Sequence, residues 1–232
     1  AEQRLTGAMA VESVRADDTS RSYRDALVES LYELANFSAQ PHVVLKVVKI
    51  IGSFLKDPKL FRSKMMNFML CGSAGTGKTT IAETIGTIFS KAGIFVGDSL
   101  VEAGRAELVA SYEGQTVSRT ANFLLSNLDN GVIFIDEAYA ITPWMNGKPE
   151  GYGLEAATAM VEFMTKYKGL YCIIVAGYEM QMVRYFLGSN EGLSRRFPHK
   201  LVLRDSSPSE LVRIFKRQLL KQQGLPTPDG EG

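Results

Sequence analysis

The segment at residues 72–79, with the sequence GSAGTGKT, constrains this chain more than any other feature. It follows the G-x-x-x-x-G-K-T pattern of a phosphate-binding loop, and it lies between an apolar run and an amphipathic helical pattern, the context that the motif requires. Glycines let backbone N–H groups turn toward an anion, and the following helix presents the positive end of its dipole. The sequence therefore predicts a nucleoside triphosphate site at a strand-to-helix turn.

The polar side chains of this loop have defined roles in phosphate binding. Lys78 can reach the β- and γ-phosphates, and the Thr79 hydroxyl can ligate Mg²⁺. A glycine-rich turn that matches by chance is the alternative, and the flanking strand and helix patterns disfavour it. The predicted nucleotide contacts are Ser73, Ala74, Gly75, Thr76, Gly77, Lys78, Thr79 and Thr80, with Asp136 from a later strand.

Two acidic residues, Asp136 and Glu137, directly follow the apolar run at residues 132–135. Ligands bind at the carboxyl ends of the strands in open α/β sheets, so this position is informative. Asp136 can hold Mg²⁺ through water, and Glu137 can polarise an attacking water molecule. In isolation such a pair is more often a surface turn, but together with the phosphate loop it predicts a hydrolysis site.

Apolar runs and helical periodicities alternate along the chain. Strands are expected at residues 65–71, 94–96, 132–135, 171–176 and 201–203, and helices at residues 27–35, 43–54, 81–89, 154–164 and 207–219. Such alternation implies right-handed crossovers. The predicted fold is α/β, a three-layer αβα sandwich with a five-stranded parallel sheet.

Three regions are expected from the distribution of these patterns. Residues 1–22 are polar and aperiodic and are predicted to be a flexible leader. Residues 23–205 carry the main domain with its N-terminal helices. Ser207 and Glu210 have the spacing of a capping box, with Pro208 at the first helical position. The helix that opens there has an apolar face, so residues 206–232 are interpreted as the first helix of a truncated small helical lid.

Charge and cysteine usage exclude several classes of protein. Lys and Arg number 26 against 25 Asp and Glu, a formal net charge of +1, so no global field favours nucleic acid or a membrane. No apolar run approaches the ~18–20 residues that span a bilayer. Cys71 and Cys172 form no C-x-x-C pair, and His42 and His199 lack ligand partners at metal spacing. We therefore expect no membrane span, no structural zinc, and a cytoplasmic or other reducing intracellular compartment.

Four further stretches are similar to the AAA+ ATPases, and within them to the branch of red-type Rubisco activase and stage V sporulation protein K-like proteins. They are SYEGQT at 111–116, IDEAY at 135–139, VAGY at 175–178 and SNEGLSRRF at 189–197. The resemblance runs from about residue 34 to about residue 224. It implies a Mg²⁺-dependent ATPase that assembles as a homo- or hetero-oligomeric ring, commonly a hexamer. It also implies that ATP is hydrolysed between subunits while a protein client is pulled through a central pore.

The resemblance also implies roles for single residues. Arg196, and after it Arg195, corresponds to the arginine finger, which faces the nucleotide of the next subunit and stabilises transition-state charge. Tyr112, Glu113 and Gly114 fall where the family has its first pore loop, in which an aromatic ring grips an extended polypeptide. Glu113 departs from the usual hydrophobic middle residue, so an altered grip is implied.

Two other positions remain open at this level. The loop at residues 143–153 occupies the second pore-loop region, where Trp144 either contacts substrate or packs under its own loop. The family often has a polar first sensor at the end of the fourth strand. Here Tyr178 can orient water through its hydroxyl, or a neighbour such as Asn190 can do so. The second sensor belongs to the lid beyond residue 224.

Two other function classes share part of this pattern. A nucleic-acid machine, of the helicase or clamp-loader type, would also carry the phosphate loop and the acidic pair. Glu113 beside Tyr112 disfavours an anionic polymer in the pore, so nucleic acid is not the expected partner. A scaffold that binds ATP without turnover is a third class, and the intact pair of Asp136 and Glu137 argues against it.

Overall fold

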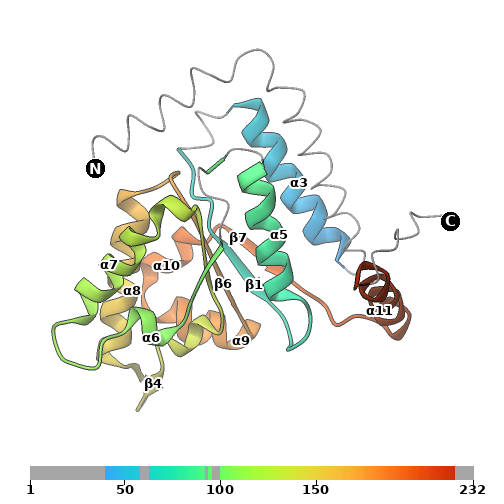
Figure 1. Ribbon diagram of the computed structural model, residues 1–232. Helices are drawn as coiled ribbons and strands as arrows, with labels where there is room; N and C mark the ends of the chain where they lie inside the picture. Colours follow the sequence, from blue (N-terminus) through green and yellow to red (C-terminus); the bar gives the residue numbers. More distant parts are fainter. Residues whose placement is uncertain (1–39, 58–62, 92–93, 96–99, 223–232) are drawn as a thin grey trace.

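The computed structural model describes residues 40–57, 63–91, 94–95 and 100–222 (Figure 1). The leader and the helix predicted at 27–35 lie outside these residues. Five parallel strands form one sheet in the order β2-β3-β6-β1-β7. Their bounds are β1 Phe68–Cys71, β2 Leu100–Ala103, β3 Val132–Ile135, β6 Cys172–Gly177 and β7 His199–Val202. The predicted five-stranded parallel sheet is confirmed.

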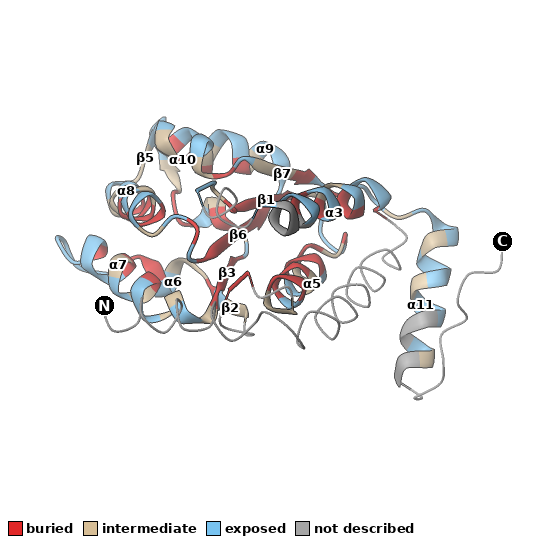
Figure 2. Cartoon of the chain, turned by 90° about the horizontal axis from the view of Figure 1, so that it is seen from above, coloured by how far each residue is buried: buried red, intermediate tan, exposed pale blue. Residues whose placement is uncertain are grey.

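Helices cover both faces of the sheet and complete the predicted three layers (Figures 1 and 2). One face carries α3 (Pro41–Lys56) and α5 (Lys78–Lys91), and the other carries α7 (Thr116–Ser126), α8 (Gly151–Lys166) and α10 (Glu191–Arg196). The three inner strands β1, β3 and β6 are buried at every position. Such continuous apolar runs are typical of parallel strands that are covered on both faces.

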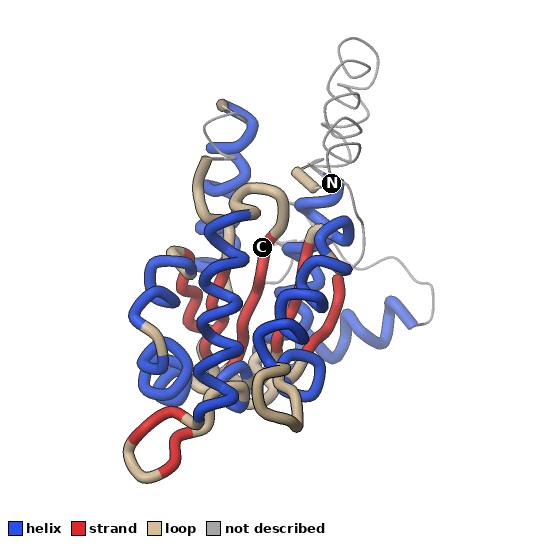
Figure 3. Tube along the Cα trace, turned by 90° about the vertical axis from the view of Figure 1, so that its left-hand side faces the viewer, coloured by secondary structure: helices blue, strands red, loops and turns tan. Residues whose placement is uncertain are grey.

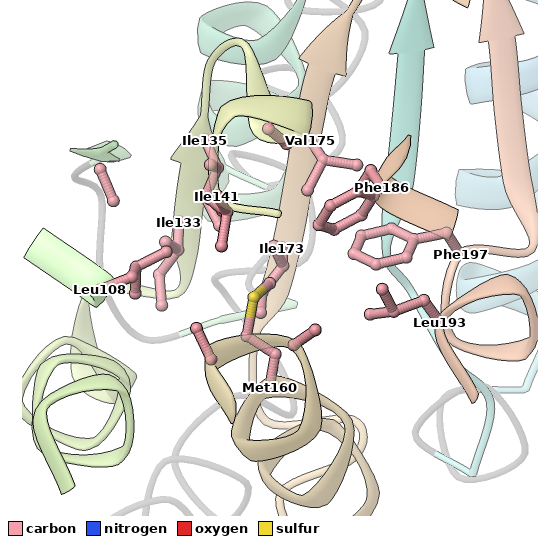
Figure 4. Close-up of a cluster of buried hydrophobic side chains, with 14 of the residues drawn as sticks. Leu108, Ile133, Ile135, Ile141, Met160, Ile173, Val175, Phe186, Leu193 and Phe197 are labelled. Atoms are coloured by element: carbon pink, nitrogen blue, oxygen red, sulfur yellow. The ribbon is translucent and has the colours of Figure 1, made fainter. Parts of the chain in front are cut away.

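Each face of the sheet has its own hydrophobic core. Phe68, Leu70 and Phe134 point toward α3 and α5. The alternate residues Ile133, Ile135, Ile173 and Val175 point the other way, toward Met160 of α8 (Figure 4). Because successive strand side chains alternate between faces, the same short strands supply both cores.

In the described part of the chain, the backbone groups along the outer edge of β7 bond to side chains and not to another strand. Lys46 Nζ donates to the carbonyl of Lys200 at 2.6 Å, and His42 Nε2 lies 2.6 Å from the carbonyl of Val202. Gln40 bonds both the carbonyl and the N–H of Arg204, at 2.6 and 3.1 Å. The start of α3 therefore covers an edge that would otherwise invite pairing. His42, although exposed, therefore has a bonding partner at the sheet edge.

The second strand is not where the sequence placed it. Residues 94–95 form a bend, and residue 96 lies outside the described part of the chain, whereas the strand is β2. Ile94 and Phe95 are nevertheless buried, because Phe95 packs on Phe89 with ring centroids 5.8 Å apart. These two residues are therefore apolar because they are buried against α5, and not because they belong to a strand.

Several connecting elements were not predicted. They are α6 (Arg105–Leu108), α7, α9 (Glu179–Gln181), a π-helical segment at Met182–Leu187, α10, and the antiparallel hairpin of β4 (Trp144–Met145) with β5 (Lys148–Pro149). Asn146 and Gly147 both have positive φ, 52° and 78°, as the two-residue turn of a hairpin requires. The Asn-Gly pair was the signal that identifies this hairpin, which projects at the lower left of Figure 3.

The last helix, α11 (Pro208–Gln222), extends away from the sandwich (Figure 2). Its start has the predicted capping box, since the N–H of Ser207 donates to Glu210 Oε2 at 2.7 Å. Leu211, Val212 and Phe215 are all more than half exposed. This apolar face is the one that the sequence assigned to a lid helix.

Both cysteines are buried and unpaired. Burial raises the pKa of the Cys71 thiol to about 11, and it raises the pKa of Cys172 well above its usual value. Burial, followed by the charge of Lys46, lowers the pKa of His199. A buried thiol with a raised pKa carries little thiolate, so both cysteines are unreactive groups of the core.

Two glycines in the first turn of α8 provide a matched test of this packing. A Cβ on Gly153 would collide with the carbonyl oxygen of Ile141 and lie 2.9 Å from the Cα of Thr142, whereas a Cβ on Gly151 meets nothing within 4 Å. We expect Gly153→Ala to destabilise the protein by about 1–3 kcal/mol. Gly151→Ala should leave stability unchanged or slightly raised. Thermal melts of the two variants check this, and equal melting temperatures would contradict the packing of α8.

Candidate active site at the carboxyl edge of the sheet

The register of the sheet places the phosphate loop and the acidic pair at the same edge. Val175 of β6 pairs with Met69 on one side and with Ile135 on the other. Asp136 and Gly72 therefore both follow their strands at the carboxyl ends. Strands lie about 4.8 Å apart, so only the width of β6 separates the two motifs. A cavity of about 380 Å³ opens beside the loop, between Ser73, Tyr178 and Leu203.

The loop has the backbone geometry that its glycines predicted. Gly75 and Gly77 have φ of 77° and 87°, in the left-handed region that favours glycine. A Cβ on Gly72 would lie 2.8 Å from Thr76 Oγ1, a separation that real Cβ atoms do not show. Thr76 Oγ1 donates to the carbonyl of Ser73 at 2.9 Å and closes the loop. Ser73, Ala74 and Gly75 are exposed at its tip.

Lys78 is nearly buried, with 8% of its surface exposed, at the first position of α5. Its Nζ donates to the carbonyls of Gly72 and Ser73 at 3.0 and 2.9 Å, and it lies 5.6 Å from the ring centroid of Tyr178. Among the described residues no carboxylate lies within ion-pair distance of this ammonium. Its charge is thus held by carbonyl dipoles and a ring, and it can bind an anion that enters the loop.

Glu137 has a strained backbone, and one of its two carboxylate oxygens lacks a partner among the described residues. Its φ of 47° and ψ of 43° are left-handed, which costs a residue with a side chain on the order of 1–3 kcal/mol. Its Oε2 is buried and has no hydrogen-bond partner among the described residues. Its N–H donates to Asp136 Oδ1 at 2.9 Å. Such strain and such an orphaned acceptor are typical of functional positions.

Tyr139 lies beside this carboxylate. Burial, followed by a hydrogen bond to Glu137, raises the pKa of its hydroxyl far above the usual value. Its ring centroid is 6.4 Å from that of Tyr178, which in turn covers Lys78. Tyr139, whose role was not predicted, therefore joins the acidic pair to the phosphate loop.

The described residues fit a magnesium ion that is shared with a bound nucleotide. They contain no group of three or more His, Cys, Asp or Glu side chains that could hold a metal. Mg²⁺ commonly takes one or two protein ligands together with phosphate oxygens and water. Asp136 is exposed at the end of β3, and Thr79 is half-buried at the start of α5, so both remain available as oxygen ligands.

The two candidates for the first sensor have different surroundings. Tyr178 lies at the end of β6 against Lys78. Asn190 caps α10, because its Oδ1 accepts from the N–H of Gly192 at 2.9 Å, and its Nδ2 donates to Thr158 at 3.2 Å. The amide of Asn190 is thus engaged on α8 and α10, whereas the hydroxyl-bearing ring of Tyr178 is at the phosphate loop.

The two candidate arginines also differ. Arg196 Nη2 donates to Thr165 Oγ1 at 2.7 Å, and its Nε is buried without a partner among the described residues. Arg195 is exposed on the last turn of α10. Among the described residues, neither arginine contacts the phosphate loop of its own chain.

The candidate pore-loop residues lie on the surface before α7. Tyr112 is 71% exposed, and Glu113 and Gly114 are exposed beside it. The base of this loop is braced, because Thr120 Oγ1 donates to the carbonyl of Leu108 at 2.8 Å and Thr116 Oγ1 accepts from Ala110 N–H at 3.2 Å. An exposed ring on a fixed base can contact a partner without local unfolding.

A network centred on Arg105 ties these loops to the acidic pair, and sequence reasoning missed it. Its guanidinium donates to the carbonyl of Ile141 at 2.7 Å and to Glu150 Oε2 at 2.7 Å. Glu150 also caps α8, since its Oε2 accepts from Gly153 N–H at 3.1 Å. Arg105 therefore joins the start of α6, the segment after Glu137 and the residue that follows the hairpin.

Comparison with known proteins agrees with this geometry. Residues 68–199, more than half of the chain, match the family described as "ATPase family associated with various cellular activities (AAA)". The chain is 36% identical over 154 residues to stage V sporulation protein K of Bacillus subtilis. The matched stretch covers 66% of this chain and 46% of that protein. It is 39% identical over 152 residues to ESX-1 secretion system protein EccA1 of Mycobacterium tuberculosis, covering 66% of this chain and 26% of that protein.

A third relative is the chloroplastic ribulose bisphosphate carboxylase/oxygenase activase of Cyanidioschyzon merolae. The identity is 35% over 166 residues, covering 72% of this chain and 55% of the relative. The chain thus spans about a quarter to just over half of the length of these three relatives. No helix in the described ranges is long and apolar enough to cross a membrane.

The network of Arg105 can be compared with an exposed ion pair in the same protein. Arg105→Met keeps the aliphatic stem but removes the bonds to Ile141 and Glu150, so we expect a loss of about 1–3 kcal/mol in the free energy of unfolding. Lys200→Met removes an ion pair with Glu179 that has side chains 38% and 50% exposed, and it should cost less than about 1 kcal/mol. Urea denaturation of both variants checks this, and a reversed order would contradict the proposed importance of Arg105.

Proposed function

The chain belongs to the AAA family of ATPases, and we propose that it hydrolyses ATP in a ring of subunits and uses that energy to pull on a protein client through a central pore. The observation that carries this proposal is the series of contacts from Lys78 through the rings of Tyr178 and Tyr139 to Glu137, at the carboxyl edge of the sheet. Phosphoryl transfer requires mainly positioning and charge stabilisation, which such an arrangement provides.

In this proposal each residue of the edge has one task. The loop N–H groups of residues 73–79 hold the phosphates, and Lys78 neutralises the charge of the β- and γ-phosphates. Thr79 and Asp136 would hold Mg²⁺, which when bound shields the phosphate charge. Glu137 accepts a proton from the attacking water, and Tyr178 orients that water through its hydroxyl. The unsatisfied Oε2 of Glu137 supports its assignment as the base.

The assembly and the client follow from residues that face outward. Arg196, with Arg195 as the second candidate, would reach the γ-phosphate in the next subunit. Tyr112 would grip the client, with Glu113 altering that grip. One relative is named as an activase of another enzyme, which supports a protein as client. The net charge of +1 and the position of Glu113 do not favour the nucleic-acid alternative.

Two further parts of the proposal concern the rest of the protein. We interpret α11 as the first helix of a small helical lid, because its apolar residues Leu211, Val212 and Phe215 are exposed. A lid helix would bury that face against the remainder of its domain. Buried, unpaired thiols are compatible with a reducing intracellular compartment such as the cytoplasm.

Glu137→Gln tests the catalytic assignment. The amide cannot accept the proton, so ATP turnover should fall by a factor of about 10²–10⁴ while ATP still binds. Lys78→Ala should instead lose nucleotide binding, and Glu162→Gln on the exposed face of α8 is the matched control. A fluorescent ATP analogue measures binding, and phosphate release measures turnover. Unchanged turnover in Glu137→Gln would contradict the assignment.

The same variant also tests assembly and client binding. With ATP bound and not hydrolysed, Glu137→Gln should form a ring on size-exclusion chromatography and retain an unfolded polypeptide. If the variant binds ATP but stays monomeric and retains no polypeptide, the proposed remodelling function is wrong. That result would not contradict the proposed ATPase activity.

Subunit mixing tests the arginine finger. Arg196→Ala subunits have a complete nucleotide site but lack the finger, and Glu137→Gln subunits have the finger but a dead site. Each variant alone should hydrolyse ATP much more slowly than the unaltered protein. For Arg196→Ala, the loss of the finger should lower the rate by a factor of about 10³–10⁵. Mixed rings should recover activity, because the Arg196 of one subunit serves the site of its neighbour. Recovery with Arg195→Ala instead would move the finger to Arg195, and no recovery with either would sink the assignment.

A further inference from the structure

A second cavity lies between the β4–β5 hairpin and the π-helical segment Met182–Leu187, and its volume is about 530 Å³. Three aromatic side chains line it, Tyr139, Trp144 and Tyr185, together with Gln181 and Arg184. It is larger than the cavity beside the phosphate loop, and no step of ATP hydrolysis uses it. Its aromatic lining is typical of a ligand pocket.

The two walls of this cavity are bonded to each other. The carbonyl of Tyr185 accepts from Trp144 Nε1 at 3.2 Å and from Thr142 Oγ1 at 3.1 Å. The indole N–H is therefore already used, and what Trp144 offers to a ligand is its ring. The ring of Trp144 packs against Tyr185, with ring centroids 6.0 Å apart. The wide turn of the π-helical segment presents that carbonyl, as such turns often do at functional sites.

The polar groups of the cavity define what it would accept. Arg184 is the one charged residue among the lining residues that the structure describes, and its guanidinium lies 5.6 Å from the ring centroid of Tyr185. Gln181 Oε1 is buried and has no hydrogen-bond partner among the described residues. The site thus combines aromatic rings, one cation and one acceptor that lacks a donor. A peptide supplies all three counterparts, namely an apolar side chain, a carboxylate and an N–H group.

We propose that this cavity binds an extended segment of the protein client, with a large apolar side chain between Trp144, Tyr185 and Tyr139 and a neighbouring acidic side chain on Arg184. This rests on the proposed function, since it assigns a site to the client of that machine. Aromatic faces accept many apolar side chains, which suits a client of varied sequence. The charge complementarity at Arg184 selects acidic segments over basic ones.

The cavity shares a wall with the nucleotide site. Tyr139 lines it, and the same ring packs within contact distance of Gly177, where a Cβ would lie 3.0 Å from Tyr139 Cδ1. Its ring also meets Tyr178, which covers Lys78. A side chain that enters the cavity therefore touches a residue that is one ring away from the phosphate loop. Tyr139 acts as a positioning residue that makes ATP turnover sensitive to the client segment.

The fluorescence of Trp144 tests the site directly, because this is the only tryptophan of the chain. The probes are blocked synthetic peptides that carry Asp-Phe-Asp, Asp-Gly-Asp or Lys-Phe-Lys between glycines. We expect a saturable change in Trp144 emission with the first peptide and much weaker responses with the other two. Arg184→Gln should weaken binding of the first peptide by about two- to fivefold, as expected for an exposed charge pair. Arg213→Gln, an exposed arginine on α11, is the matched control.

Several results would overturn this assignment. They are the absence of any saturable response, an equal response to the lysine peptide, or a change in emission that follows protein concentration alone, which would place a second copy of the chain in the cavity. The titration needs no ATP hydrolysis and can be repeated with Glu137→Gln. A protein that binds the peptide but has no ATPase activity would therefore count against the proposed function alone. An active ATPase whose Trp144 is silent to the peptides would count against the cavity alone.

The substitution Tyr139→Phe tests whether Tyr139 links the cavity to ATP turnover, because it removes the hydroxyl but keeps the ring that lines the cavity. It should keep the fluorescence response to the Asp-Phe-Asp peptide while changing the effect of that peptide on kcat rather than on the KM for ATP. An unaltered effect on kcat would remove Tyr139 from the coupling.

Discussion

The pairing of β6 with β1 on one side and β3 on the other is the constraint on which the rest of this molecule depends. Val175 pairs with both Met69 and Ile135, so the three buried strands end at nearly the same level. Since parallel strands carry their carboxyl ends at one edge, the phosphate loop, Tyr178 and the acidic pair must meet there. A register shift of one residue would turn the core side chains of β6 to the opposite face, so the cores on both faces protect the geometry of the site.

The site stores polar groups that the protein alone does not satisfy. Among the described residues, the charge of Lys78 is met by carbonyls and a ring, and Glu137 is held in a left-handed conformation with one buried oxygen that no described group binds. Each arrangement has a cost in folding free energy. A bound anion and a water molecule would satisfy these groups, which is the physical reason to regard the edge as a preformed site rather than as a loop.

Around this edge the connections are coupled through a few backbone carbonyls. Arg105 binds the segment after Glu137, and the carbonyl of Tyr185 binds both Thr142 and Trp144. The hairpin and the π-helical segment are thereby held to each other, and the segment after Glu137 is held from two sides, by Arg105 at Ile141 and by Tyr185 at Thr142.

Much of this could be predicted from the sequence, because the decisive signals are local. Residues 72–79 determine their own turn through glycine, the run at 132–135 predicts a buried strand, and Ser207 with Glu210 predicts the start of a helix. The second strand was misplaced, because Ile94 and Phe95 are apolar and buried without forming a strand, whereas β2 carries an exposed Glu102 and has a weaker apolar signal. The bond from Arg105 to Glu150 joins residues 45 positions apart, the bond from Trp144 to Tyr185 joins residues 41 apart, and the bond from Asn190 to Thr158 joins residues 32 apart. Contacts of this range carry no periodic signal in the sequence, so only the tertiary structure decided them.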